Sequence, residues 1–255
     1  MRLNNLKTRL IGKRIIFLQE IDSTNSEARR LVAHGEKEGT VIIADSQVKG
    51  RGRHDRRWVS PPGGLYLSVI LKPYVNPSKL SLITLLCSIA VVRTIRGLFK
   101  LPADVKWPND IVIHGKKIGG VLCEAKNNNV IAGIGVNLNT NISLFPQALR
   151  KQVTSLRFEL GANVNKDKFV SILLEEVEGL YRDFLHRRYE DIVLEWSSYC
   201  QTLGQKVKIE TERGVEKGIA EAIGKRGELN LRGADGKIKK VFSEDVINVH
   251  SLEQK

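Results

Sequence analysis

Metal-binding and disulfide signatures are missing from this 255-residue sequence. Its three cysteines, Cys87, Cys123 and Cys200, are widely spaced without a C-x-x-C pair, and its five histidines are scattered. An odd, dispersed set of cysteines argues against both a disulfide framework and a zinc site. Cys87 and Cys123 lie in apolar stretches, so we expect them to be small core residues. The sequence therefore predicts no resident metal ion.

Targeting segments and long hydrophobic runs are also missing. The stretch RIIFLQEID is too short for a signal peptide, and LSLITLLCSIAVV stops at Arg93, short of a membrane span. Aromatic residues make up 6% of the chain and do not interleave with the charge as in a nucleic-acid stacking platform. We therefore expect a soluble cytoplasmic protein with no membrane partner and no specific nucleic-acid partner.

The commonest nucleotide-binding signatures are absent as well. No segment fits G-x-x-x-x-G-K-[ST], and GIGVNL (133–138) supplies G-x-G without the third glycine of a dinucleotide fingerprint. A nucleotide, if it binds, must be held by another device.

Positive charge is what the chain has in excess. The net charge is +13, which favours anionic partners without choosing among nucleic acid, nucleotides and acidic proteins. The charge is concentrated in KGRGRHDRRW (49–58), which directly follows a predicted buried strand. Glycines let a backbone approach a ligand closely, and guanidinium groups bind phosphate or carboxylate. This stretch is either a solvated basic loop, a nucleic-acid patch or a cradle for a small anion.

Hydrophobic periodicity predicts an α+β protein. A helix after STN (23–25) has capping-box spacing between Thr24 and Glu27 and a stop signal at Gly35. A hairpin is expected to turn at Gly115. Strands are expected over 14–19, 40–45, 64–71, 105–110, 110–126 and 129–139, and helices over 78–99, 166–186 and a shorter segment ending near 199.

The residue pattern changes after Leu203, where short segments of alternating polar and apolar residues are separated by glycine turns. Four or five such strands predict a small β-barrel. We place a boundary near residue 200, which predicts a larger α+β domain at 1–200 and a small β domain at 201–255.

Several short polar motifs carry two interpretations each. STN is either a helix cap or a ligand-facing helix N-terminus, and the Asn109–Asp110 pair of KWPND is either an Asx turn or a polar strand end. Lys117 of KIGGVLCE is either a surface lysine or a ligand group, and Gln47 alone is a surface amide.

The order and spacing of these motifs resemble the catalytic domain of biotin protein ligases. STN, Gln47 before GRGR, RRW, KWPND, KIGGVLCE and GIGVNLN carry the resemblance, which extends over about residues 15–250. It implies a mixed β-sheet flanked by helices, as in class II aminoacyl-tRNA synthetases, followed by an SH3-like β-barrel. The resemblance also implies two steps: biotin and ATP, with Mg²⁺, give biotinyl-5′-AMP, and a lysine of a biotin carboxyl carrier protein or domain then takes the biotinyl group.

The resemblance assigns roles by motif. Catalytic roles fall to Arg53, Lys117 and Asp110, the last orienting or deprotonating the acceptor lysine. The biotin-binding set is Ser23, Thr24, Asn25, Gln47, Gly50, Arg51, Gly52, Arg53, Lys117 and Gly120. The adenylate set is Arg51, Arg53, Arg56, Trp58, Asn109 and Asn137. The loop at 48–57 is expected to order over the bound intermediate and exclude water.

The chain departs from the family pattern in two places. Asp55 stands where many members have glycine, and we expect it to pair with Arg56 or Arg57 in the empty site. The first strand begins near residue 14, which leaves no room for the N-terminal DNA-binding domain of some members, so no repressor role is expected.

Family members often form homodimers. A lipoate or octanoate ligase or transferase and a basic nucleic-acid-binding protein are the alternative functions.

Overall fold

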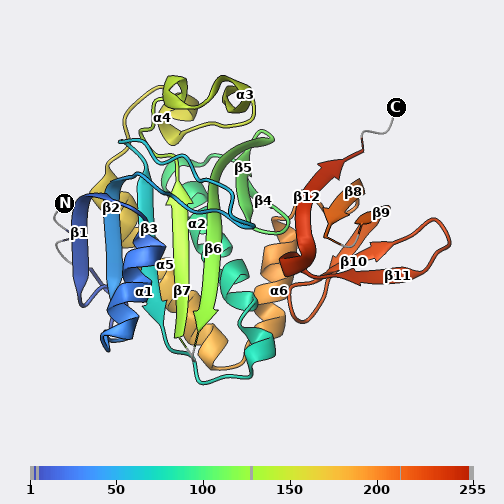
Figure 1. Ribbon diagram of the computed structural model, residues 1–255, viewed down its shortest axis with the longest axis horizontal. Helices are drawn as coiled ribbons and strands as arrows, with labels where there is room; N and C mark the ends of the chain where they lie inside the picture. The colour runs from blue at the N-terminus through green and yellow to red at the C-terminus, as the bar shows by residue number, and fades with distance from the viewer. Residues whose placement is uncertain (1–2, 4–5, 127–128, 213, 253–255) are drawn as a thin grey trace.

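A seven-stranded mixed sheet forms the centre of the larger part of the molecule. The computed structural model describes residues 3, 6–126, 129–212 and 214–252 (Figure 1). The strand order is β1-β2-β3-β7-β6-β5-β4, in which only β1 and β2 pair in parallel. The strands are β1 (Ile15–Ile21), β2 (Val41–Gln47), β3 (Leu65–Leu71), β4 (Ala103–Lys106), β5 (Asp110–Ile113), β6 (Lys116–Lys126) and β7 (Asn129–Val136).

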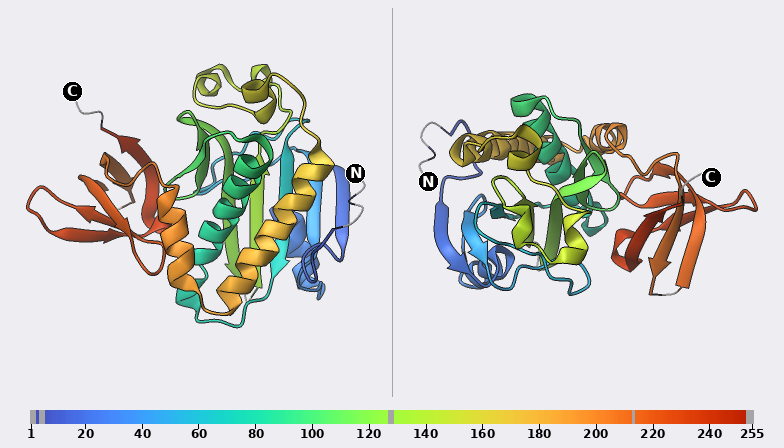
Figure 2. Two further views of the ribbon diagram at one scale, coloured as in Figure 1. Left: turned by 180° about the vertical axis from the view of Figure 1, so that it is seen from behind. Right: turned by 90° about the horizontal axis from the view of Figure 1, so that it is seen from above.

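Helices cover both faces of this sheet, unequally. α2, α5 and α6 lie together behind it, whereas α1 covers the lower part of the front (Figures 1 and 2). The loop after β2 crosses the upper part of the front (Figure 1). The helices are α1 (Thr24–Ala33), α2 (Leu82–Phe99), α3 (Gln147–Arg150), α4 (Leu156–Leu160), α5 (Lys166–Leu185) and α6 (Tyr189–Ser198), with 3-10 turns η1 (Pro77–Lys79) and η2 (Ile142–Leu144).

The core forms because apolar strands meet the apolar faces of the rear helices. All seven residues of β3 are buried, as expected for a strand covered on both faces. Cys87 is fully buried on α2 and Cys123 packs against the same core, which confirms their predicted place. The segment Pro77–Phe99 is long and apolar enough to cross a membrane, but 67% of its most apolar window is buried inside the protein. It serves here as a core helix packed against α5.

The C-terminal part is a five-stranded antiparallel sheet of order β11-β10-β9-β8-β12. This sheet confirms the expected SH3-like fold. The indole of Trp107 ties it to the larger sheet, because Nε1 donates to the Gly227 carbonyl at 3.2 Å and the ring is 1% exposed. The division into domains at residue 200 stays a prediction. The elements are β8 (Lys206–Thr211), β9 (Gly214–Ile223), β10 (Leu229–Arg232), β11 (Ile238–Val241), η3 (Ser243–Asp245) and β12 (Val246–Ser251).

Most predicted elements are confirmed, and two details differ. The N-cap of α1 is Ser23 without a side-chain cap bond, so the predicted capping box of Thr24 and Glu27 is wrong. The Thr24 hydroxyl is turned instead toward Gln47 and Ser68 inside the cleft. The connection after Leu138, expected as a long loop, contains η2, α3 and α4.

Candidate active site

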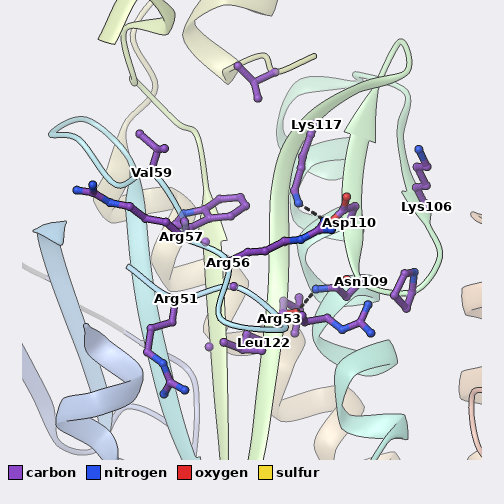
Figure 3. Close-up of a pocket in the computed structure, with 18 of the residues that line it drawn as sticks. Arg51, Arg53, Arg56, Arg57, Val59, Lys106, Asn109, Asp110, Lys117 and Leu122 are labelled. Atoms are coloured by element: carbon purple, nitrogen blue, oxygen red, sulfur yellow. Dashed lines mark hydrogen bonds and ion pairs between the residues drawn. The ribbon is translucent and has the colours of Figure 1, made fainter. Parts of the chain in front are cut away.

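A cleft of about 650 Å³ opens on the front of the sheet, between the basic loop and strands β6 and β7. Sequence-distant parts of the chain line it, among them the start of α1, the loop after β2, the Trp107–Asp110 turn with Lys117, β7 and β12. The sheet brings them together because β3 pairs with β7, although α2 and strands β4 to β6 lie between these two strands along the chain. Figure 3 shows the side chains of the central part.

The basic loop is a β-hairpin that folds back on itself. The backbones of Arg51 and Arg57 form an antiparallel β-bridge, and the amide of Trp58 donates to the Gly50 carbonyl at 2.9 Å. A Cβ on Gly50 would lie 2.3 Å from the Trp58 carbonyl oxygen and 2.4 Å from Ser60 Oγ. In the structure Gly50 therefore permits close contact within the chain itself. Whether Gly50 and Gly52 also contact a ligand stays a prediction.

The tip of this hairpin has the backbone of a type I′ turn. The amide of Arg56 donates to the Arg53 carbonyl at 3.1 Å, and His54 and Asp55 have φ of 49° and 54°. The second of these positions strongly favours glycine. Asp55 forms no ion pair with Arg56 or Arg57 within the described part of the chain, contrary to the expected pairing. Arg56 instead donates to Asn248 at 2.9 Å.

Replacing Asp55 with glycine should therefore stabilise the protein. Left-handed backbone costs a non-glycine residue about 1 kcal/mol, partly offset by the greater flexibility of glycine in the unfolded chain. We expect the free energy of unfolding of Asp55→Gly, measured by urea denaturation, to rise by up to about 1 kcal/mol. Asp235→Gly is the control, because Asp235 accepts from the Lys237 amide at 3.1 Å in an exposed turn and its loss should destabilise. A destabilised Asp55→Gly variant would contradict this account of the turn.

The two loop arginines have different surroundings. Arg51 Nη1 contacts Glu124 at 2.9 and 3.1 Å and points away from Lys117 (Figure 3). Arg53 instead reaches the C-terminal sheet, where it donates to the carbonyls of Ser243 and Val246, the latter at 3.0 Å. Burial lowers the pKa of the Arg53 guanidinium, against an opposing effect of the nearby Asp110 carboxylate. Arg51 thus belongs to one end of the cleft and Arg53 to the other.

Lys117 and Asp110 form the second charged centre. Lys117 Nζ lies 2.6 Å from Asp110 Oδ1 and 5.1 Å from the centre of the Trp58 ring. Asp110 begins β5 and Lys117 is the second residue of β6, so the hairpin at Gly115 sets their pairing. The side chain of Asn109 bonds within the protein, since its Nδ2 donates to the Val121 carbonyl at 2.7 Å. Gly120 lies next to the Trp58 ring, because a Cβ added to Gly120 would lie 3.4 Å from that ring.

Two predicted adenylate residues bury polar atoms that lack a hydrogen bond within the described chain. These atoms are Trp58 Nε1 and Asn137 Oδ1. Asn137 is 1% exposed, and its amide nitrogen donates to the Thr154 carbonyl at 2.9 Å. A buried polar atom without a partner costs free energy, so it indicates a place for a ligand or water.

The start of α1 forms the opposite end of the cleft. The Thr24 amide donates to Gln47 Oε1 at 2.8 Å, and Asn25 Nδ2 donates to Glu124 at 2.8 Å. Just before it, Asp22 Oδ1 accepts from the Ser23 amide at 2.7 Å, and a side-chain hydrogen bond with Arg30 lowers the pKa of the Asp22 carboxyl to about 2. The Ser23 side chain makes no cap bond and lines the cleft.

Sequence reasoning missed several lining and supporting residues. Glu124 was visible as the last letter of KIGGVLCE but had no assigned role, and Ser68 sits inside an apolar strand where nothing marks it. Asn248 reaches the site only through the C-terminal sheet. Others missed are Ser60, which accepts from Gln47, and the lining residues Lys106, Phe145, Leu149, Gln152, Val246 and His250. No group of three or more potential metal-ligating side chains occurs among the residues that the structure describes.

Comparisons with known proteins identify the family of this chain. The family model for the biotin/lipoate A/B protein ligase family matches residues 17–141. The bifunctional ligase/repressor BirA of Bacillus subtilis is 36% identical over 94% of this chain and 76% of that protein, and the biotin–[acetyl-CoA-carboxylase] ligase of Mycobacterium tuberculosis is 28% identical over 96% and 94%. The solved structure of the Aquifex aeolicus biotin protein ligase in complex with biotin and ATP is 29% identical, with a TM-score of 0.84 over 94% of this chain and 100% of that one. This chain belongs to the biotin/lipoate A/B protein ligase family.

Proposed function

We propose that the protein is an ATP-dependent biotin protein ligase. It activates biotin as biotinyl-5′-AMP and transfers the biotinyl group to a lysine of a biotin carboxyl carrier protein or domain. The observation that carries this function is one cleft with a polar, hydrogen-bonding end at Thr24 and Gln47 and a cationic end at Lys117 and Arg53. An elongated acid with a polar head fits such a cleft, with the carboxylate at the cationic end.

Charge neutralisation is the main task of the cationic end. A biotin carboxylate must approach the α-phosphate of ATP, and the two anions repel each other. Fixed cations placed where charge develops lower this barrier. Lys117 and Arg53 are assigned this role, and Mg²⁺ arrives with ATP as part of the substrate. Breakage of the bond between the α- and β-phosphates releases pyrophosphate and leaves the mixed anhydride.

The adenylate side is assigned to Trp58 and Asn137. The buried Oδ1 of Asn137 suits a donor such as the amino group of adenine, and the Trp58 ring offers a flat surface. Asp110 is assigned to the second step, in which the carrier lysine must lose a proton before its amine attacks the anhydride. AMP then leaves as the amide bond forms. A cytoplasmic location, an acidic carrier and a homodimer complete the proposal.

Biotin-dependent ATP–pyrophosphate exchange tests the first half-reaction. We expect the purified protein to exchange labelled pyrophosphate into ATP when biotin and Mg²⁺ are present, and to biotinylate a carrier domain in a second assay. Lipoate and octanoate serve as competing substrates, since the family includes ligases for lipoate. Exchange that depends on lipoate rather than biotin would replace the proposed function with the second one.

A further inference from the structure

Arg56, just after the turn of the basic hairpin, extends toward the side of the cleft that holds Asp110 and Lys117 (Figure 3). Its Nη2 donates to Asn248 Oδ1 at 2.9 Å, and among the described residues its guanidinium forms no ion pair. The acceptor lies on β12 of the C-terminal sheet, 192 residues further along the chain. An amide oxygen is neutral, so it holds the guanidinium in place without cancelling the charge that an anionic ligand needs.

A β-bulge in β12 gives Asn248 its direction. Ile247 is an extra residue in this strand, because the register with β8 shifts between Val246 and Asn248. Residues two apart on a regular strand face the same side of a sheet, whereas the Val246 side chain packs in the core and the Asn248 side chain contacts Arg56. Bulges occur often beside active sites, where they redirect a side chain. The bulge thus lets one short strand both fill the core and reach the basic hairpin.

Glu210, opposite Asn248 on β8, fixes the other end of the Asn248 amide. Asn248 Nδ2 donates to Glu210 Oε2 at 2.9 Å, and Lys208 Nζ lies 2.7 Å from Oε1. Hydrogen bonds from Lys208 and Asn248 lower the pKa of the Glu210 carboxyl to about 2, so at neutral pH this group is ionised and can only accept. Arg56 can only donate. The Asn248 amide therefore satisfies both neighbours in one orientation, with Nδ2 toward Glu210 and Oδ1 toward Arg56.

The C-terminal sheet is fixed against the larger sheet, which gives Asn248 a defined place relative to the hairpin. Trp107 Nε1 donates to the Gly227 carbonyl at 3.2 Å from a ring that is 1% exposed. Arg53 donates to the Val246 carbonyl at 3.0 Å, two residues before Asn248. Both arginines that flank the hairpin turn are thus held by neighbouring positions of one strand.

We propose that Asn248 is a positioning residue that holds the Arg56 guanidinium for the phosphates of ATP, with Glu210 fixing its amide. The C-terminal sheet thereby contributes to the first half-reaction through Arg56. A neutral acceptor suits this task, because a carboxylate in its place would pair with Arg56 and compete with phosphate. The inference rests on the proposed function, since ATP supplies the phosphates.

Biotin-dependent ATP–pyrophosphate exchange by the full-length protein, with ATP and biotin varied in turn, tests the inference. We expect Asn248→Ala to raise the KM for ATP about tenfold, the usual cost of one hydrogen bond to a charged group, and to leave the KM for biotin within about twofold. Asn230→Ala is the matched control, because Asn230 lies on β10 of the same sheet, opposite Ala222 and Lys240. It should leave both KM values within about twofold.

A double-mutant cycle decides whether Asn248 acts through Arg56. In an Arg56→Met background, Asn248→Ala should raise the KM for ATP by less than about twofold, because the side chain that Asn248 positions is already gone. An equal rise in both backgrounds would overturn the inference, as would an unchanged KM for ATP or an equal rise for ATP and biotin in Asn248→Ala alone. Each of these results leaves the proposed function intact. Wild-type protein without biotin-dependent exchange would overturn the proposed function together with the inference.

A second variant keeps the test decisive if Asn248→Ala fails to fold. Asn248→Leu has nearly the shape of the native side chain and forms neither of its hydrogen bonds, so we expect the same rise in the KM for ATP. Urea denaturation of each variant shows whether it is folded under the conditions of the exchange assay.

Discussion

Replacing Lys117 with methionine is expected to lower kcat for biotin-dependent ATP–pyrophosphate exchange by about 10²- to 10³-fold, the usual cost of losing one fixed charge-stabilising group. The ammonium group lies 2.6 Å from Asp110 and 5.1 Å from the Trp58 ring, inside the cleft. Methionine keeps the length and apolar stem of the side chain and removes its charge. The loss therefore reports charge neutralisation rather than packing.

The neighbouring lysine is the matched control for this substitution. Lys116 is exposed, and its Nζ lies 5.8 Å from the centre of the Phe158 ring. Successive side chains of a strand point to opposite faces, so Lys116→Met changes the same charge outside the cleft. We expect it to retain exchange within about twofold, the range of a neutral surface substitution. A Lys117→Met enzyme within about tenfold of wild type would remove Lys117 from the first half-reaction.

Two glycines of β7 should affect different substrates when each is replaced with alanine. A Cβ on Gly133 would lie 2.2 Å from Asn25 Oδ1, and one on Gly135 would lie 2.9 Å from Trp58 Nε1. Inserting a methyl group into a packed site costs about 1–3 kcal/mol, which corresponds to roughly a ten- to hundredfold change in affinity. We expect Gly133→Ala to raise the KM for biotin and Gly135→Ala to raise the KM for ATP by about these factors.

Initial-rate kinetics with each substrate varied in turn separates the two effects. Gly97→Ala on α2 is the control, since the described chain places no atom within 4 Å of the added carbon apart from its chain neighbours and the nearby backbone of α2, and alanine suits a helix. It should leave both KM values unchanged. If both β7 variants raised the same KM, the assignment of opposite cleft ends to biotin and ATP would be wrong.

The basic hairpin shows how far residue patterns reach. Its composition and its place after a buried strand predict an anion-binding element, because amino-acid types alone set its charge. The same pattern does not predict which partners each arginine side chain contacts. Arg51 and Arg53 are two residues apart and were assigned to both substrates, yet Arg51 contacts Glu124 and Arg53 contacts the carbonyls of Ser243 and Val246. The difference depends on partners located 73, 190 and 193 residues away along the chain.

Local signals determined the elements, the motif order and, through them, the family of this protein. Strand and helix periodicity and glycine turns depend on neighbours within a few residues, and the order of the motifs from STN to KIGG can be read directly from one chain. Tertiary structure alone decided which groups meet. The Glu124–Asn25–Ser68–Thr24 network joins β6, α1 and β3, and Asn248 enters from the second sheet. Hydrogen-bond direction depends on atoms within about 3 Å in space, and no sequence spacing encodes that proximity.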